Sequence, residues 1–73
     1  MGAIYYRFQK GQTHINRNGS TYTVIEVVSQ SELVLLRSDG WKITVHNPQI
    51  YDDPEGLRME WNSSTGGHFT KVL

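Results

Sequence analysis

The sequence predicts an all-β fold, and two observations carry that prediction. Apolar and polar residues alternate in short runs, and turn-forming Gly, Asn, Asp and Ser residues separate these runs. Signals for helices are nearly absent. With 73 residues the chain has room for one domain, residues 1–73, and no repeat or linker divides it.

The first strand is expected over residues 3–9, where apolar side chains alternate from Ile4 through Tyr6 to Phe8. A turn at Lys10-Gly11 should follow. The polar run 12–16 is too short to assign by itself.

The longest strand is expected over residues 20–29, after a tight turn at Asn18-Gly19. Its alternation breaks near Ile25. Either both faces of this strand are buried, or a β-bulge near Ile25 resets the register. We favour the bulge, because a small barrel must bend a long strand around a corner.

Trp41 is the first residue of the second strand in the next strand pair. The face on which it lies decides whether its indole is available to bind a ligand or packs in the core. Asp39-Gly40 predicts a type I′ hairpin between the apolar run 32–38 and the strand 41–45. Alternation in this strand puts Trp41 on its apolar face, so we expect the indole to pack inside. The same face carries Ile43 and Val45.

The remaining sequence predicts a long connection and two more strands. Residues 49–56 read as irregular, with one helical turn and with Ile50 or Tyr51 tucked under as a lid. Strand 57–61 should turn Leu57, Met59 and Trp61 inward, and strand 68–73 should bring Phe69, with Val72 or Leu73, to the core. Five or six short antiparallel strands are most economically arranged as a small SH3-like barrel, because closure protects strand edges.

Composition restricts the functions available to the chain. Seven Lys and Arg residues balance seven Asp and Glu residues, which argues against a protein that binds the phosphate backbone through a basic excess. There is no cysteine for disulfides or thiolate zinc sites, no phosphate-binding loop and no nucleophile coupled to a base. We therefore expect a non-enzymatic protein without a cofactor. The absence of an apolar run long enough for a membrane span or a signal peptide favours the cytoplasm.

The histidines carry a weak metal signal. His14, His46 and His68 come from three different strand regions and lack the paired spacing of zinc ligands, so we expect no metal site.

Protein binding is the function that these features favour. Tyr5 and Tyr51 are not required by the predicted core, and tyrosine is favoured at interfaces. Asp52, Asp53 and Glu55, with Glu60 close by, form the main charge concentration, which is expected to be a solvated loop or an acidic docking surface. An unpaired edge strand would also allow a homodimer.

Single-stranded nucleic-acid binding is the alternative, because small barrels stack bases on exposed aromatic residues beside basic ones. Its candidate residues are Arg7, Arg17, Lys42 and His46.

Overall fold

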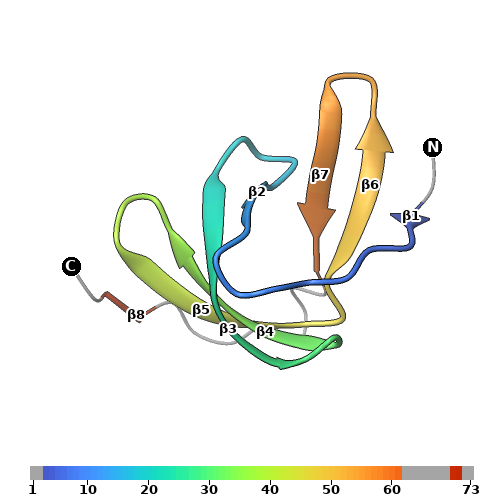
Figure 1. Cartoon of the computed structure of the whole chain (residues 1–73). Helices are drawn as coiled ribbons and strands as arrows, with labels where there is room; N and C mark the ends of the chain where they lie inside the picture. The colour runs from blue at the N-terminus through green and yellow to red at the C-terminus, as the bar shows by residue number, and fades with distance from the viewer. Residues whose placement is uncertain (1–2, 62–69, 72–73) are drawn as a thin grey trace.

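The computed structural model describes residues 3–61 and 70–71, which form eight β-strands in two antiparallel sheets (Figure 1). The three-stranded sheet has the order β1-β6-β7 and the five-stranded sheet the order β2-β3-β4-β5-β8. The all-β prediction is confirmed, and the described residues contain no helix that could cross a membrane. The strands are β1 (Ala3–Ile4), β2 (Thr13–Ile15), β3 (Thr21–Ser29), β4 (Glu32–Arg37), β5 (Trp41–His46), β6 (Gln49–Asp53), β7 (Gly56–Glu60) and β8 (Thr70–Lys71).

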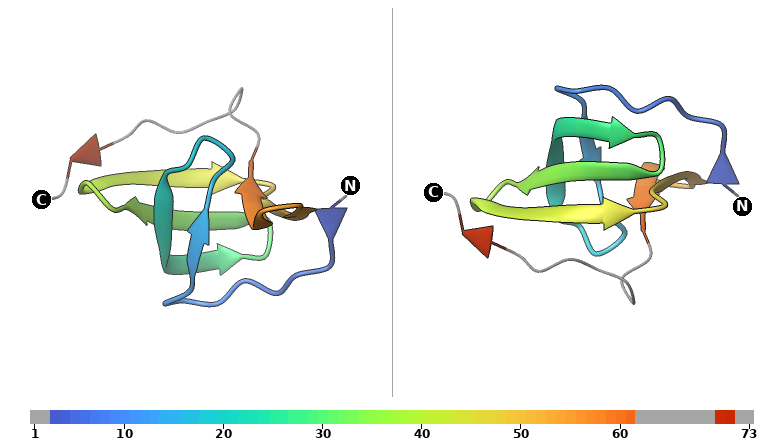
Figure 2. Two further views of the ribbon diagram at one scale, coloured as in Figure 1. Left: turned by 90° about the horizontal axis from the view of Figure 1, so that it is seen from above. Right: turned by 90° about the horizontal axis from the view of Figure 1, so that it is seen from below.

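The two sheets are joined at one point by an isolated parallel bridge between Asn16 and Met59. The Asn16 side-chain amide donates a hydrogen bond of 3.0 Å to the Met59 carbonyl oxygen. Viewed along two further directions, the β6–β7 hairpin and β1 project from one end of the larger sheet (Figure 2). The strand pairs described do not close the sheets into a ring, so the SH3-like barrel stays a prediction.

The predicted bulge in the longest strand is confirmed. Val24 pairs with Leu35 and Glu26 pairs with Val34, so Ile25 has no partner of its own and the register shifts there. The shift lets Tyr22 and Val24 face the core before the bulge and Val27 pack against it afterwards.

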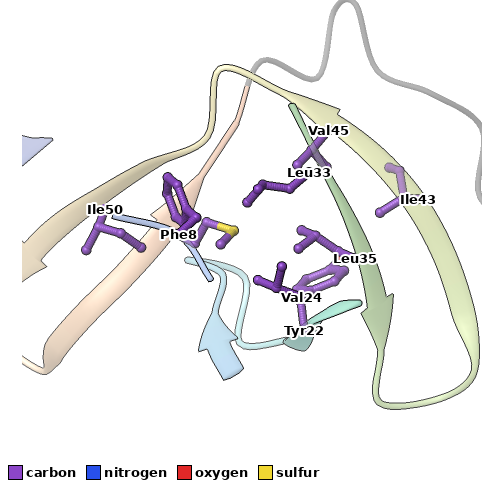
Figure 3. Packing of buried hydrophobic residues seen from close by; sticks show 9 residues of the cluster. Phe8, Tyr22, Val24, Leu33, Leu35, Ile43, Val45 and Ile50 are labelled. Atoms are coloured by element: carbon purple, nitrogen blue, oxygen red, sulfur yellow. The ribbon is translucent and has the colours of Figure 1, made fainter. Parts of the chain in front are cut away.

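The hydrophobic core lies between the two sheets, with contributions from both and from the segment after β1 (Figure 3). Phe8 is held there although it lies in no strand. The Gln30 side chain accepts a hydrogen bond of 2.7 Å from the Phe8 amide and donates one of 3.0 Å to the Phe8 carbonyl. The buried hydrophobic residues are Phe8, Tyr22, Val24, Leu33, Leu35, Ile43, Val45, Ile50 and Met59.

Two parts of the predicted pattern are wrong at the ends of the small sheet. The first strand covers only Ala3–Ile4, and Ile4 is exposed on this strand, which is an edge of the small sheet and has no further strand paired to it among the described residues. Leu57 was expected inward, but it pairs with Asp52 where β6 and β7 extend beyond the core.

The connection predicted over residues 49–56 is a strand followed by a hairpin turn. Gln49–Asp53 forms β6, and Asp53 pairs with Gly56 across Pro54-Glu55. Asp, Pro and Gly at the first, second and fourth positions are the preferences of a type I turn. The prediction of an irregular segment with a helical turn is therefore wrong, whereas the burial of Ile50 is confirmed.

The hairpin at Asp39-Gly40 is confirmed, but its predicted type is wrong. Only Gly40 has a positive φ there, 97°, and its amide donates to the Arg37 carbonyl at 2.9 Å. A type I′ turn needs positive φ at both central residues, so this loop is instead a type I turn followed by a left-handed glycine. Trp41 follows the loop and is half-buried on the core side of β5.

Trp61 packs against the core, and its ring meets Tyr22 edge-on with centroids 5.0 Å apart. Met59 is buried as predicted. The expectations for Phe69, Val72 and Leu73 lie outside the described residues.

Candidate functional site

The small sheet β1-β6-β7 has two faces of different chemistry, which the pairing register defines. The core-side face contains Ile50 and Met59 and extends past the core to Asp52. The outer face is polar apart from one aromatic ring. Residues of the core-side face are Ile4, Ile50, Asp52, Leu57 and Met59, and those of the outer face are Gln49, Tyr51, Asp53, Arg58 and Glu60.

Arg17 reaches the outer face from the β2–β3 hairpin and joins two of the predicted partner-binding residues. Its guanidinium carbon lies 4.5 Å from the Tyr51 ring centroid, and its Nη2 lies 3.4 Å from Asp53 Oδ1. The Tyr51 hydroxyl donates a hydrogen bond of 2.8 Å to Gln49 Oε1. Arg17, predicted as a nucleic-acid-binding residue, thus belongs to the same cluster as Tyr51 and Asp53, which were predicted to bind a protein partner. Such exposed contacts stabilise a fold by about 1 kcal/mol or less each.

The acidic residues of this hairpin do not form a single surface. Asp53 is paired with Arg17, and Glu55 Oε2 lies 3.6 Å from Arg58 Nη2. Asp52 lies on the opposite, core-side face, is exposed and has no ion-pair partner among the described residues.

Large apolar side chains remain in solvent at the core-side face and beside it. Tyr5, directly after β1, is 92% exposed. Ile4 and Leu57, on the face itself, are 41% and 47% exposed. We refer to Ile4, Tyr5, Asp52 and Leu57 as the apolar–acidic surface.

The other predicted nucleic-acid residues lie apart from Arg17. Lys42 and His46 share the outer face of β5 in the large sheet, where they flank Thr44. Arg7 is exposed in the segment after β1. The structure therefore brings together only two of the four side chains.

His14 lies in the core, apart from the other described histidine. Its ring meets the Tyr6 and Phe8 rings edge-on, with centroids 5.3 and 5.9 Å away, and its Nε2 lies 3.2 Å from Gln12 Oε1. Burial lowers the pKa of His14 below its ordinary value of 6.5. Within residues 3–61 and 70–71, no three His, Asp or Glu side chains gather where they could hold a metal ion, and His68 lies outside this part.

The hairpin between β4 and β5 carries a two-bond ion pair. Arg37 donates hydrogen bonds of 2.7 and 3.0 Å to the two carboxylate oxygens of Asp39. These bonds lower the pKa of Asp39 and raise the pKa of Arg37.

Two hollows open on the outer face of the small sheet. The hollow near the hairpin tip is lined by Arg17, Asp53, Pro54, Glu55 and Arg58. The hollow at the base of the hairpin is lined by Asn47, Gln49, Tyr51, Glu60 and Trp61.

Sequence reasoning missed the second hollow, because it treated residues 49–56 as irregular. The signal was present: Asp53-Pro54-Glu55-Gly56 as a turn places Gln49 opposite Glu60, as the structure does. Comparisons of this chain with protein-family models, with curated proteins and with solved structures give no match.

Proposed function

We propose that this chain is a non-enzymatic protein-interaction module that binds its partner through the apolar–acidic surface. The observation that carries the proposal is the distribution of exposed large hydrophobic side chains. Five are exposed among the described residues: Ile4 and Leu57 lie on the core-side face of the small sheet, and Tyr5 directly follows β1. Removing apolar area from water contributes about 25 cal/mol of favourable free energy per Å². A complex in which the partner covers these side chains is therefore stabilised.

The chemistry of the surface favours a protein partner with apolar and basic groups. Tyr5 supplies a large, rigid ring of the kind enriched at interface centres. Asp52 pairs with Leu57, two positions along β6 from Ile50, the register partner of Ile4, and it has no ion-pair partner among the described residues. A basic side chain at the partner's rim would complement this carboxylate. The proposal does not require that the sheets close into an SH3-like barrel.

Single-stranded nucleic-acid binding is the second candidate and has weaker support. Lys42 and His46 share a face of β5, but no exposed aromatic residue of the described chain lies with them in the register. Stacking on aromatic rings is a main source of affinity for single strands.

Capture experiments with matched variants test the proposal. The wild type, Tyr5→Ala/Leu57→Ser and Val28→Ser are immobilised, and proteins retained from a lysate are quantified by mass spectrometry. Val28 is 54% exposed on β3 of the other sheet, so its replacement controls for the loss of an exposed apolar group.

We expect at least one protein to be retained by the wild type and by Val28→Ser but to be reduced about tenfold with the double variant. Identical retention by all three, with equal thermal stability, would contradict the proposal.

A further inference from the structure

The outer face of the small sheet shows how this chain binds a guanidinium. Arg17 lies over the Tyr51 ring at 4.5 Å, and Asp53 supplies a carboxylate at 3.4 Å. An aromatic face and a carboxylate together favour a cation, because the ring quadrupole and the negative charge both attract it. The hollow at the hairpin tip therefore contains its own cations, Arg17 and Arg58.

The hollow at the base of the hairpin also contains aromatic and acidic groups, and none of the described residues that line it is a cation. Tyr51 and Trp61 supply aromatic rings, and Glu60 is the charged residue among the described residues of its lining. Its volume of about 330 Å³ lies within the range of about 300–1,000 Å³ found for ligand sites. Asn47, in a left-handed conformation with φ of 54°, and Gln49 complete the lining with amide groups.

Arg58 is the basic residue nearest to Glu60 along β7, on the same face, yet it does not neutralise this carboxylate. Its Nη2 is directed to Glu55 at 3.6 Å, and its Nη1 donates to the Leu57 carbonyl at 3.0 Å. Both contacts lie toward the hairpin tip. In the described part of the chain, Glu60 has no ion-pair partner.

We infer that this hollow is a receptor for a lysine or arginine side chain of the partner protein. The inference rests on the proposed function and adds a second contact, on the opposite face of the hairpin from the apolar–acidic surface. Glu60 supplies the counter-charge. The Tyr51 hydroxyl and Gln49 Oε1, already joined by a hydrogen bond, supply further acceptor lone pairs, and the Trp61 ring supplies a π face.

The test is an NMR titration with three capped amino acids: the N-acetyl, N-methylamide derivatives of lysine, arginine and norleucine. Norleucine has the apolar stem of lysine without its ammonium group. We expect saturable shifts of the Trp61 indole N–H and the Gln49 side-chain amide with lysine or arginine, in the millimolar range, and no such shifts with norleucine.

Two isosteric variants assign the site. Glu60→Gln should weaken binding of the cationic probe about tenfold, because it removes the charge while keeping the shape. Glu26→Gln, at an exposed carboxylate of β3 in the other sheet, should titrate as the wild type does.

Three results would overturn the inference: no shift up to about 50 mM probe, equal shifts with norleucine, or wild-type affinity in Glu60→Gln. Any of these, together with partner capture that still depends on Tyr5 and Leu57, removes the cation receptor and leaves the proposed function intact. If the cationic probe binds but partner capture does not depend on Tyr5 and Leu57, the proposed function is wrong and the cation site remains.

Discussion

His14 is the one buried polar or charged residue among those the structure describes. It is enclosed by the rings of Tyr6 and Phe8 and contacts Gln12, all from the segment between β1 and β2. Tyr22, its register partner on β3, is its neighbour in the five-stranded sheet. No charged side chain contributes to its shift, since desolvation is the cause of its lowered pKa. Protonating His14 would place an uncompensated charge in the core.

The stability of the protein should therefore depend on pH through His14. Because the pKa in the folded state is lower than the ordinary 6.5, the unfolded chain takes up the proton first and stability falls as pH falls through that value. We expect the free energy of unfolding to decline between about pH 7.5 and pH 5, and to decline less steeply in His14→Gln. Urea denaturation at several pH values measures both slopes. Parallel curves for the two proteins would show that His14 does not carry the effect.

Individual site residues were predictable only where alternation alone decides them. Tyr5 was expected to be free of the core from its parity, and it is the most exposed large hydrophobic side chain described. The position of Tyr51 under Arg17 depends on a contact between residues 34 positions apart in the sequence. The roles of Glu60 and Trp61 depend on the register of β6 against β7. This register was not predicted, because residues 49–56 were expected to be irregular. Side-chain clusters built across two hairpins cannot be read from local periodicity.

Three hairpins of the chain share one feature: a glycine occupies the fourth position of the turn. In each of them the glycine has a positive φ, at Gly19, Gly40 and Gly56. Such loops set the strand register, and a register slip of one residue would exchange the core and solvent faces of a strand. The turns therefore determine which side chains form the two faces of the small sheet.

Gly19 offers the cleanest test of this role. An added Cβ there meets no atom within 4 Å, so the positive φ of 94° is the only obstacle to a side chain. We expect Gly19→Val to lower the free energy of unfolding by about 1–3 kcal/mol, because a β-branched residue is strained in this region. Gly19→Asn is the matched control and should lose clearly less, since asparagine tolerates the left-handed conformation. Equal losses in both variants would exclude backbone strain as the cause.

At the level of elements, the central strands followed directly from the pattern. Alternation predicted β3, β5 and β7, an apolar run before a hairpin turn predicted β4, and the interruption near Ile25 predicted the bulge. Two errors have physical reasons. The segment after β1 is held by the Gln30 side chain instead of a neighbouring strand, and this contact spans 22 positions. β6 was missed because Pro54 was taken as a sign of irregular structure, although proline suits the second position of a type I turn.

The whole molecule consists of a curved five-stranded sheet and a smaller sheet that share one core. Among the described residues, the backbone joint between them is one bridge between Asn16 and Met59, supported by the side-chain hydrogen bond of Asn16. Sequence periodicity does not report such long-range pairing, so it predicted the central strands, whereas the closed SH3-like barrel was inferred from the number of strands alone. Beyond the joint, the β6–β7 hairpin projects from the end of the larger sheet (Figure 2).

This projection gives the molecule two chemically distinct surfaces on one hairpin. By the register, Ile4, Asp52 and Leu57 lie on the core-side face of the small sheet, and the hollow lined by Glu60, Tyr51 and Trp61 opens on the outer face. A partner that contacts both the apolar–acidic surface and the hollow would enclose the hairpin. It would bury apolar side chains on one face and place a cation beside Glu60 on the other.

Photo-crosslinking from position 5 tests the proposed interface most directly. A benzoylphenylalanine replaces Tyr5, or Val28 as the control, and the protein is irradiated in the cells that produce it. We expect the position 5 variant to yield a discrete adduct with another protein, and the position 28 variant to yield none. No adduct from position 5, or the same adducts from both positions, would contradict a protein-binding surface at the small sheet.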